Sequence, residues 1–233
     1  MTIVDTRPIT HSVFEGRQRS VAAAFLVLGP AIMLASSIMA SLAQSKAPGA
    51  SDVEVAVAAP TQYFLGLAFD LLTPPTLLAW VVVLLLALRP WAARTAWTGA
   101  IALGLQACGL AAVTGMELCA ATLAVNGMDT TRITSVMDSG ITTSSAGKVL
   151  AIMFFPTEIV GLIAIGIAVW RTRWAPRAVA VVLIASPFID FLVNGTPWAS
   201  AGFFVLFFGA SAWLAVLISR NGAPIPNSDG HTV

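Results

Sequence analysis

The stretch "LLAWVVVLLLALRPWAARTAWTGAIALGL", residues 77–105, decides the fold that the sequence predicts. Two apolar runs flank a short segment that begins with Arg89 and ends with Arg94. A helix that crosses a bilayer needs about 20 mostly apolar residues, and these runs belong to longer apolar stretches, residues 63–88 and 95–123. We therefore expect two membrane spans that form a hairpin around the arginine-bearing turn.

The whole chain has the composition of a membrane protein. Of its 233 residues, 58% are hydrophobic and 10% are charged, and the mean hydropathy is +0.88. A soluble domain carries roughly 25% charged residues, so this chain lacks the polar surface that a soluble fold requires. We expect an all-α, polytopic bundle of six transmembrane helices, at residues 21–42, 63–88, 95–123, 149–170, 178–193 and 198–219.

The distribution of basic residues predicts the orientation of this bundle. Lys and Arg concentrate in the cytoplasmic loops of membrane proteins, and only Lys46, Arg132 and Lys148 fall on one side of the predicted spans. The other nine basic residues fall on the opposite side, so we expect both termini to be cytoplasmic: Arg7, Arg17, Arg19, Arg89, Arg94, Arg171, Arg173, Arg177 and Arg220. The net charge of +1 gives no basic surface for nucleic acid.

The expected organisation is a tail at 1–20, a six-helix domain at 21–219 and a second tail at 220–233. Three details stay open. The first span is expected to be retained, although a signal peptide is the alternative. The turn at 194–197 predicts a tight hairpin between the last two spans. The similar segments 91–94 and 174–177 reflect either an internal duplication or the same interfacial preference of Trp and Arg.

Four acidic residues interrupt the predicted helices, one in each of the second to the fifth: Asp70, Glu117, Glu158 and Asp190. No Lys or Arg lies within any predicted helix to pair with them. An ionisable residue at membrane depth is by default a candidate for a functional site. The alternative is a structural role, in which a protonated carboxyl forms a hydrogen bond between helices, and Glu117 fits that role best.

Counting along the helices suggests how deep these acids lie. At about 1.5 Å per residue, Glu158 and Asp190 each lie roughly 20 Å from a cytoplasmic arginine, and Asp70 and Glu117 lie nearer the outer surface. We expect all four to share the outer half of the bundle and to line one cavity. The pair Pro74-Pro75 is expected to kink or break the second helix beside this cavity.

Polar residues accompany two of the acids. Gln106 and Thr114 lie on the same helical stripe as Glu117, where they could form hydrogen bonds to a neighbouring helix. Asn194 lies four residues after Asp190, on the same face.

A carboxyl group buried away from cations keeps its proton at neutral pH, which suits two kinds of function. An enzyme could protonate an alkene and stabilise the carbocation with aromatic faces. A transporter could cycle the proton to drive solute movement, and with six helices it would be expected to act as a homodimer. The sequence contains no phosphate-binding glycine loop and no cluster of Cys and His, so neither cofactor nor metal is expected.

The chain also resembles the small integral-membrane terpene cyclases of bacteria and fungi, in its size, its isolated membrane acids and their aromatic neighbours. Pro156-Thr157-Glu158 is similar to the Pro-x-Glu element of small membrane lycopene cyclases. The Trp-Glu stretch of the fungal enzymes is missing, so the bacterial drimentine-type cyclases are the nearest comparison. The resemblance implies a cofactor-independent, acid-initiated cyclisation of an isoprenoid or prenylated natural product, taken from the lipid bilayer.

On this hypothesis Asp190 or Glu158 is the general acid, and the full set of candidate catalytic residues is Asp190, Glu158, Asp70 and Glu117. The candidate substrate-binding residues are Phe69, Phe155, Phe188, Phe191, Asn194 and Trp198. A proton-coupled transporter or immunity factor, and a non-catalytic membrane subunit whose acids contact a partner, are the alternatives.

Overall fold

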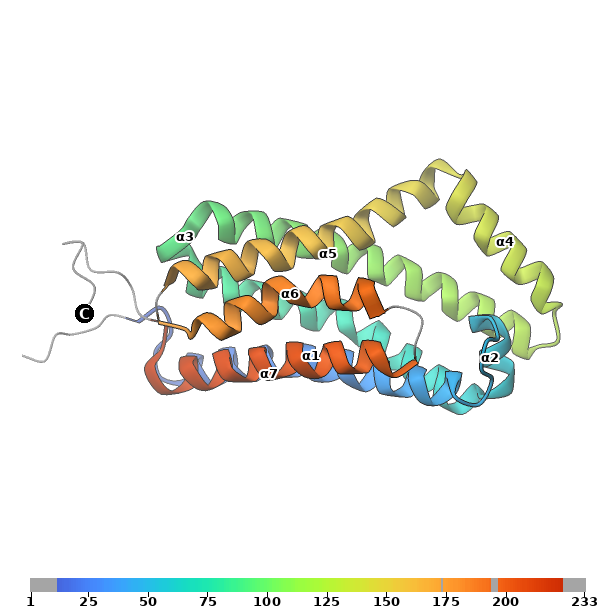
Figure 1. Cartoon of the computed structure of the whole chain (residues 1–233), viewed down its shortest axis with the longest axis horizontal. Coiled ribbons are helices and arrows are strands. Elements are labelled where there is room, and N and C mark those ends of the chain that lie inside the picture. Colours follow the sequence, from blue (N-terminus) through green and yellow to red (C-terminus); the bar gives the residue numbers. More distant parts are fainter. Residues whose placement is uncertain (1–11, 173, 194–196, 224–233) are drawn as a thin grey trace, which may run out of the picture.

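The computed structural model describes residues 12–172, 174–193 and 197–223, and within these ranges every regular element is an α-helix. This confirms the predicted all-α class. Figure 1 shows the long helices lying along one axis, with α2 and α4 together at one end. The helices are α1 (Arg17–Gln44), α2 (Asp52–Ala58), α3 (Pro60–Val125), α4 (Thr130–Thr143), α5 (Ser145–Thr172), α6 (Arg177–Val193) and α7 (Pro197–Asn221).

Helix α3 contains the predicted hairpin in one continuous element of 66 residues. Its single residue with non-helical torsion angles is Ala92, at φ −149° and ψ 56°, within the arginine-bearing turn. Beyond Ala92 the chain runs back beside its own first half (Figure 1), and Leu67 shares a buried cluster with Ala121. The turn therefore stands where the sequence predicts it, although too few residues separate the two halves to make a loop.

The expectation that Pro74-Pro75 breaks the helix is wrong, because Ala92 is the only non-helical residue in α3. The two prolines leave the carbonyl groups of Asp70 and Leu71 without their usual N–H donors. On either side of these carbonyls, the Thr73 hydroxyl donates to Phe69 O at 3.1 Å and the Thr76 hydroxyl donates to Leu72 O at 2.8 Å. Hydroxyl groups of this kind support proline-containing membrane helices.

Two segments between predicted spans, residues 43–62 and 124–148, contain the helices α2 and α4. Helix α2 begins with a capping box, in which Ser51 Oγ accepts from Glu54 N–H and Glu54 Oε2 accepts from Ser51 N–H at 2.8 Å. Helix α4 packs Ile133 against Val53 and Ala120. Helix α2 is short and α4 carries many polar residues, which is why hydropathy alone does not indicate them.

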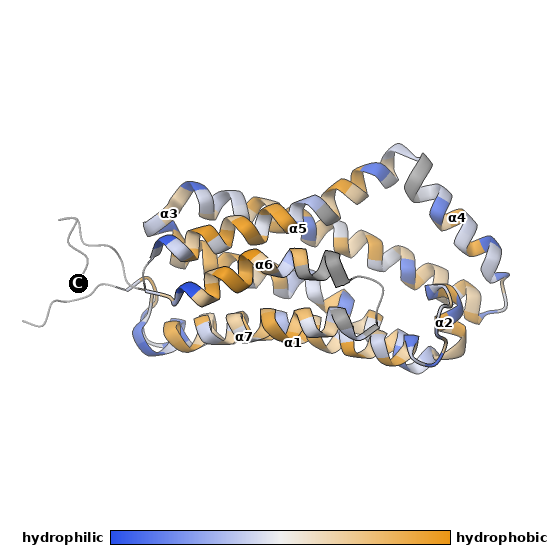
Figure 2. Ribbon diagram, in the orientation of Figure 1, coloured by the Kyte–Doolittle hydropathy of each residue, from blue (hydrophilic) through white to orange (hydrophobic). Residues whose placement is uncertain are grey.

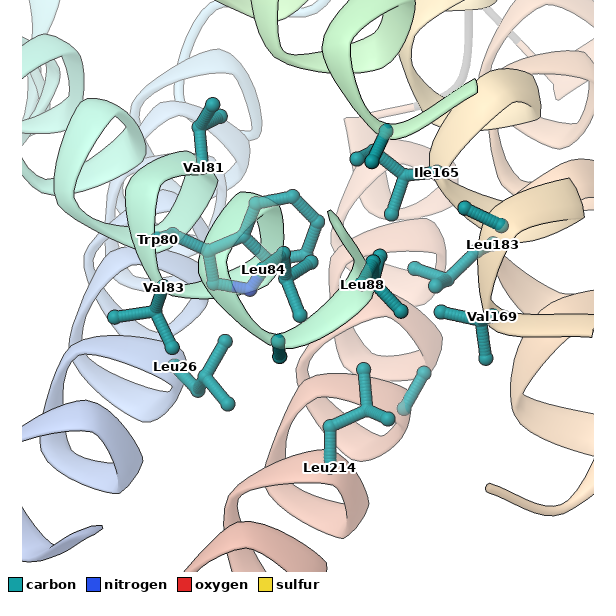
Figure 3. Packing of buried hydrophobic residues seen from close by; sticks show 14 of the residues in the cluster. Leu26, Trp80, Val81, Val83, Leu84, Leu88, Ile165, Val169, Leu183 and Leu214 are labelled. Atoms are coloured by element: carbon teal, nitrogen blue, oxygen red, sulfur yellow. The ribbon is translucent and has the colours of Figure 1, made fainter. Parts of the chain in front are cut away.

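The main core lies where α3 crosses α1 and α7. Trp80 is fully buried there, its ring centre lies 5.3 Å from that of Phe207, and its indole N–H donates to Ser211 Oγ at 3.2 Å. Figure 3 shows Trp80 among aliphatic side chains from neighbouring helices, including Leu26 and Leu214. This core fixes the position of the first half of α3 within the bundle.

The end of the bundle that holds the turn of α3 also holds both described ends of the chain (Figure 1). The Val13 N–H donates to Ala223 O at 2.8 Å, which joins the two ends directly. Arg171 donates to Thr95 Oγ1 at 3.2 Å, and Arg177 lies 5.2 Å from the ring centre of Trp170. Figure 2 shows apolar residues along the middle of the bundle and hydrophilic ones towards its ends.

Among the described residues, four helices are long and apolar enough to cross a membrane: α1, α3, α5 and the 200–221 part of α7. Helix α3 is one of these four helices, although the chain reverses direction within it at Ala92. Helix α6 is also apolar but is shorter. The number of six spans and the cytoplasmic location of the termini remain predictions.

The hydrogen bond between Trp80 and Ser211 should contribute measurably to stability. Ser211→Ala leaves the buried indole N–H without an acceptor, so we expect the free energy of unfolding to fall by about 1–3 kcal/mol. Unfolding of the purified protein in detergent measures the effect. The control is Ser219→Ala on the same helix, whose exposed hydroxyl bonds only Val216 O of its own turn. Equal losses in the two variants would contradict the assigned role of this bond.

Candidate functional site

Two of the four predicted acids, Asp70 and Glu158, line one internal cavity of about 190 Å³. We call it the acid cavity. Residues from α1, α3, α5 and α7 form its wall, so it lies inside the bundle. The lining residues are Met33, Ser36, Ser37, Asp70, Thr73, Gln106, Leu110, Phe154, Glu158 and Phe204.

Asp70 reaches the acid cavity from the first half of α3, where α1 approaches closely. One turn earlier stands Gly66, and a Cβ at that position would lie 3.5 Å from Met39 Cβ and 3.8 Å from Ser36 O. The small residue lets the two backbones come together. As a result the buried Ser36 of α1 and Asp70 of α3 line the same cavity across the helix contact.

Glu158 reaches the acid cavity from α5, which packs against the second half of α3. One close approach is at Gly109, where a Cβ would lie 3.2 Å from the backbone carbon of Met153. Phe154 and Glu158 are four residues apart on one face of α5, so both side chains line the cavity. The hydroxyl of the intervening Thr157 donates to Met153 O within the same helix.

Gln106 is the most unusual polar residue of the acid cavity. It is 4% exposed, it lines the cavity, and we find no hydrogen bond to its side chain among the described residues. A buried amide without a partner costs about 1–3 kcal/mol. The neighbouring Thr73 is also buried, but its hydroxyl donates to Phe69 O and is satisfied. Gln106 therefore offers an amide to whatever occupies the cavity.

Glu117 lines a second cavity, of about 330 Å³, together with Tyr63, Asp52 and Asp138. We call this the end cavity, because α2 and α4 form part of its wall. Glu117 lies near enough to Asp52 and Asp70 to interact with their charges. The end cavity thus continues the acidic character of the acid cavity towards the end of the bundle where α2 and α4 lie.

The position of Asp52 depends on the capping box of α2. The Ser51 N–H and hydroxyl both donate to Glu54 Oε2, at 2.8 and 2.9 Å, and these bonds lower the pKa of the Glu54 carboxyl below its usual value. Because the folded-state pKa is lowered, the bonds persist at neutral pH and are lost only as the pH falls through that value. The cap therefore holds α2 over the end cavity at neutral pH.

The two cavities are stacked along the α3 hairpin. Tyr63 of the end cavity and Asp70 of the acid cavity are seven residues apart on the first half of α3. Glu117 and Leu110 are likewise seven residues apart on the second half. Seven residues are about two helical turns, or ~10 Å. Each half of α3 therefore directs one face to both cavities in turn.

The other predicted site residues either do not line the acid cavity or lie outside the described part of the structure. Phe69 is half-buried and does not line the acid cavity, whereas Phe188 and Trp198 are 47% and 55% exposed. Asn194 and the side chains of three further residues lie outside the described part of the structure: Phe155, Asp190 and Phe191. The sequence led us to expect all four acids to line one cavity; among the described side chains, Asp70 and Glu158 line the acid cavity and Glu117 lines another.

Several residues of the acid cavity were not predicted from the sequence: Met33, Ser36, Ser37, Phe154 and Phe204. The two serines carried a usable signal, because they interrupt an otherwise apolar run. Phe154 was recognised as a neighbour of Glu158, but Phe155 was selected in its place. Nothing in the local sequence distinguishes Phe204 from the other phenylalanines of α7.

No Lys, Arg or His lines either cavity among the described residues, so both have a purely acidic set of charges. In the same part of the chain, no group of three or more His, Cys, Asp or Glu is placed to hold a metal ion. This arrangement disfavours anions and suits the binding of protons or of cations.

Comparison of the chain with known protein families, with curated proteins and with solved structures finds no match.

If Asp70 and Glu158 interact in the acid cavity, their substitutions should not be additive. For Asp70→Asn and Glu158→Gln we expect a coupling free energy of roughly 0.5–3 kcal/mol in a double-mutant cycle. Unfolding in detergent gives the four free energies. The control cycle pairs Asp70→Asn with Glu15→Gln, at an exposed residue near the opposite end of the bundle, and should be additive within about 0.5 kcal/mol. Additivity of the first cycle would show that the two carboxyls do not interact.

Proposed function

We propose that this chain is an integral membrane protein with both termini on the cytoplasmic side. Its long helices are apolar on their outward faces as well as inside. Ile101, Trp213 and Val205 are 59%, 56% and 54% exposed. A helix that is apolar all round is stable in lipid and unfavourable in water. The basic residues at the end that holds the turn of α3 support the orientation.

Within the membrane, we propose, the protein works as a small proton-coupled transporter. The single observation that carries this proposal is the meeting of Asp70 and Glu158 in one buried cavity that no described basic residue lines. Ionisation of both carboxyls in one small cavity is unfavourable without a compensating positive charge. Proton uptake and release at this pair therefore depends on what else enters the cavity, and such dependence is what couples a proton to a solute.

The end cavity supports the same proposal. It contains Glu117 and Tyr63, and Glu117 interacts with charges on both sides, those of Asp52 and Asp70. Acids arranged in this way along a pathway are typical of proton relays in pumps and transporters. Protons would enter through the end cavity and reach the pair in the acid cavity.

The size of the acid cavity favours transport over terpene cyclisation. Pockets for small organic ligands usually measure about 300–1,000 Å³, whereas this one measures about 190 Å³. A prenylated natural product is large even for that range. The cavity suits protons, water and small solutes.

Proton flux into proteoliposomes tests the proposed function without knowledge of the substrate. The vesicles contain a pH-sensitive dye, a pH gradient is imposed, and small neutral, anionic and cationic solutes are added in turn. We expect at least one class to accelerate loss of the gradient, and we expect Asp70→Asn and Glu158→Gln to abolish the effect. Glu15→Gln serves as the control and should retain it. A wild-type protein that responds to no class would contradict the proposal.

A terpene cyclase remains the second candidate, because Phe154 and Phe204 line the acid cavity beside the two acids. Aromatic faces at that position would stabilise a carbocation. Membranes containing the protein would then convert a linear isoprenoid or a prenylated indole to a cyclic product detected by mass spectrometry. Glu158→Gln should lose this activity and Glu15→Gln should keep it. No product with either substrate class would exclude the cyclase.

A further inference from the structure

We propose that the acid cavity binds a small organic ammonium ion through Asp70, Glu158 and the amide of Gln106, and that this ion displaces a proton. The inference rests on the proposed transport function and names the substrate class of the same site. Three properties of the cavity lead to it: its charge, its unpartnered amide and its apolar side.

The charge of the cavity selects a cation. Among the described residues, Asp70 and Glu158 are the only titratable ones that line it, and Glu117 of the end cavity interacts with the charge of Asp70. The Tyr63 hydroxyl lies in the end cavity and supplies no positive charge. The side chain of Asp190 on α6 lies outside the described part of the structure. A bound anion would therefore face only repulsion here.

The amide of Gln106 indicates a ligand that makes hydrogen bonds. This side chain is 4% exposed and lines the cavity, and no hydrogen bond to it is found among the described residues, so a ligand in the cavity can bond its amide. An ammonium N–H can donate to the amide carbonyl while the positive charge stays near the carboxyls. Hydrogen bonds that involve a charged group are worth about 1.5–3 kcal/mol, enough to affect affinity strongly.

The apolar side of the cavity distinguishes an organic ammonium from a metal ion. Met33, Leu110, Phe154 and Phe204 provide thioether, alkyl and aromatic surface in the lining beside the polar groups. A hydrated metal ion gains nothing from this surface, whereas the alkyl part of an amine is desolvated favourably. The two aromatic faces also attract an ammonium group directly.

Exchange with a proton follows from charge balance. When the pair is neutral, each carboxyl keeps its proton. Entry of one ammonium ion favours ionisation of one carboxyl, whose proton leaves, so the net charge of the cavity does not change. Binding should therefore release about one proton, and affinity should weaken as the pH falls because protons and ammonium ions compete for the same carboxyls.

Proton release by the purified protein in weakly buffered detergent tests the proposal. Methylammonium, tetramethylammonium, Na⁺ and acetate are added separately while a pH dye and a calorimeter record release and affinity. We expect both ammonium ions to bind and release a proton, with little response to Na⁺ or acetate. Asp70→Asn and Glu158→Gln should abolish release. A response to Na⁺ equal to that of methylammonium, or no response to either ammonium ion, would overturn the proposal.

Gln106→Met gives the sharper result, because it removes the amide and keeps the length of the side chain. Methylammonium has N–H groups and should bind about tenfold more weakly, whereas tetramethylammonium has none and should bind as before. Gln62→Met is the matched control, at a residue of α3 that lines neither cavity. An equal effect of Gln106→Met on both ligands, or an equal effect of the two variants on methylammonium, would overturn the role of Gln106.

The liposome experiment separates this inference from the proposed function. If neutral or anionic solutes dissipate the pH gradient and ammonium ions do not, the transporter stands and the substrate class is wrong. If no solute dissipates it, both fail. A gradient lost only with ammonium ions supports both.

Discussion

The close approach of α1 and α5 to opposite halves of α3 is the constraint on which the rest of the structure depends. Glycines permit it at several points, and those nearest the acid cavity include Gly66 and Gly109, where a side chain would meet the neighbouring helix at 3.5 and 3.2 Å. Association of helices in lipid relies on such packing, since lipid tails are as apolar as the helices themselves. Asp70 and Gln106 stand within one turn of these contacts, so the composition of the acid cavity follows directly from them.

The acidic character of the two cavities is the second organising feature. Together they are lined by five carboxyl groups, and no basic residue of the described chain lines either one: Asp52, Asp70, Glu117, Asp138 and Glu158. Protons or a cationic ligand suit such surroundings, which is why the proposed function and the proposed ligand arise from one property of the fold.

Much of the fold could be predicted from the sequence because long apolar runs have few alternatives to helix. The hairpin at residues 91–94 could also be predicted, since two arginines separate two such runs. Helix α2 was missed although the capping box at Ser51 and Glu54 is visible in the sequence, because its polar surroundings resemble a loop. The effect of Pro74-Pro75 was misjudged, because Thr73 and Thr76 support the helix at that point.

The sequence by itself determined which acids lie in apolar runs. It also determined that no basic residue lies within the same run to pair with them, because both properties depend on one stretch of sequence. Only the tertiary structure decided which acids meet. Asp70 and Glu158 belong to α3 and α5, and they line one cavity because these helices pack closely, at Gly109 among other places. Residue counts along each helix estimate depth alone, so they could not separate the acids of this cavity from Glu117. The unpartnered amide of Gln106 likewise emerges only when all the surrounding helices are in place.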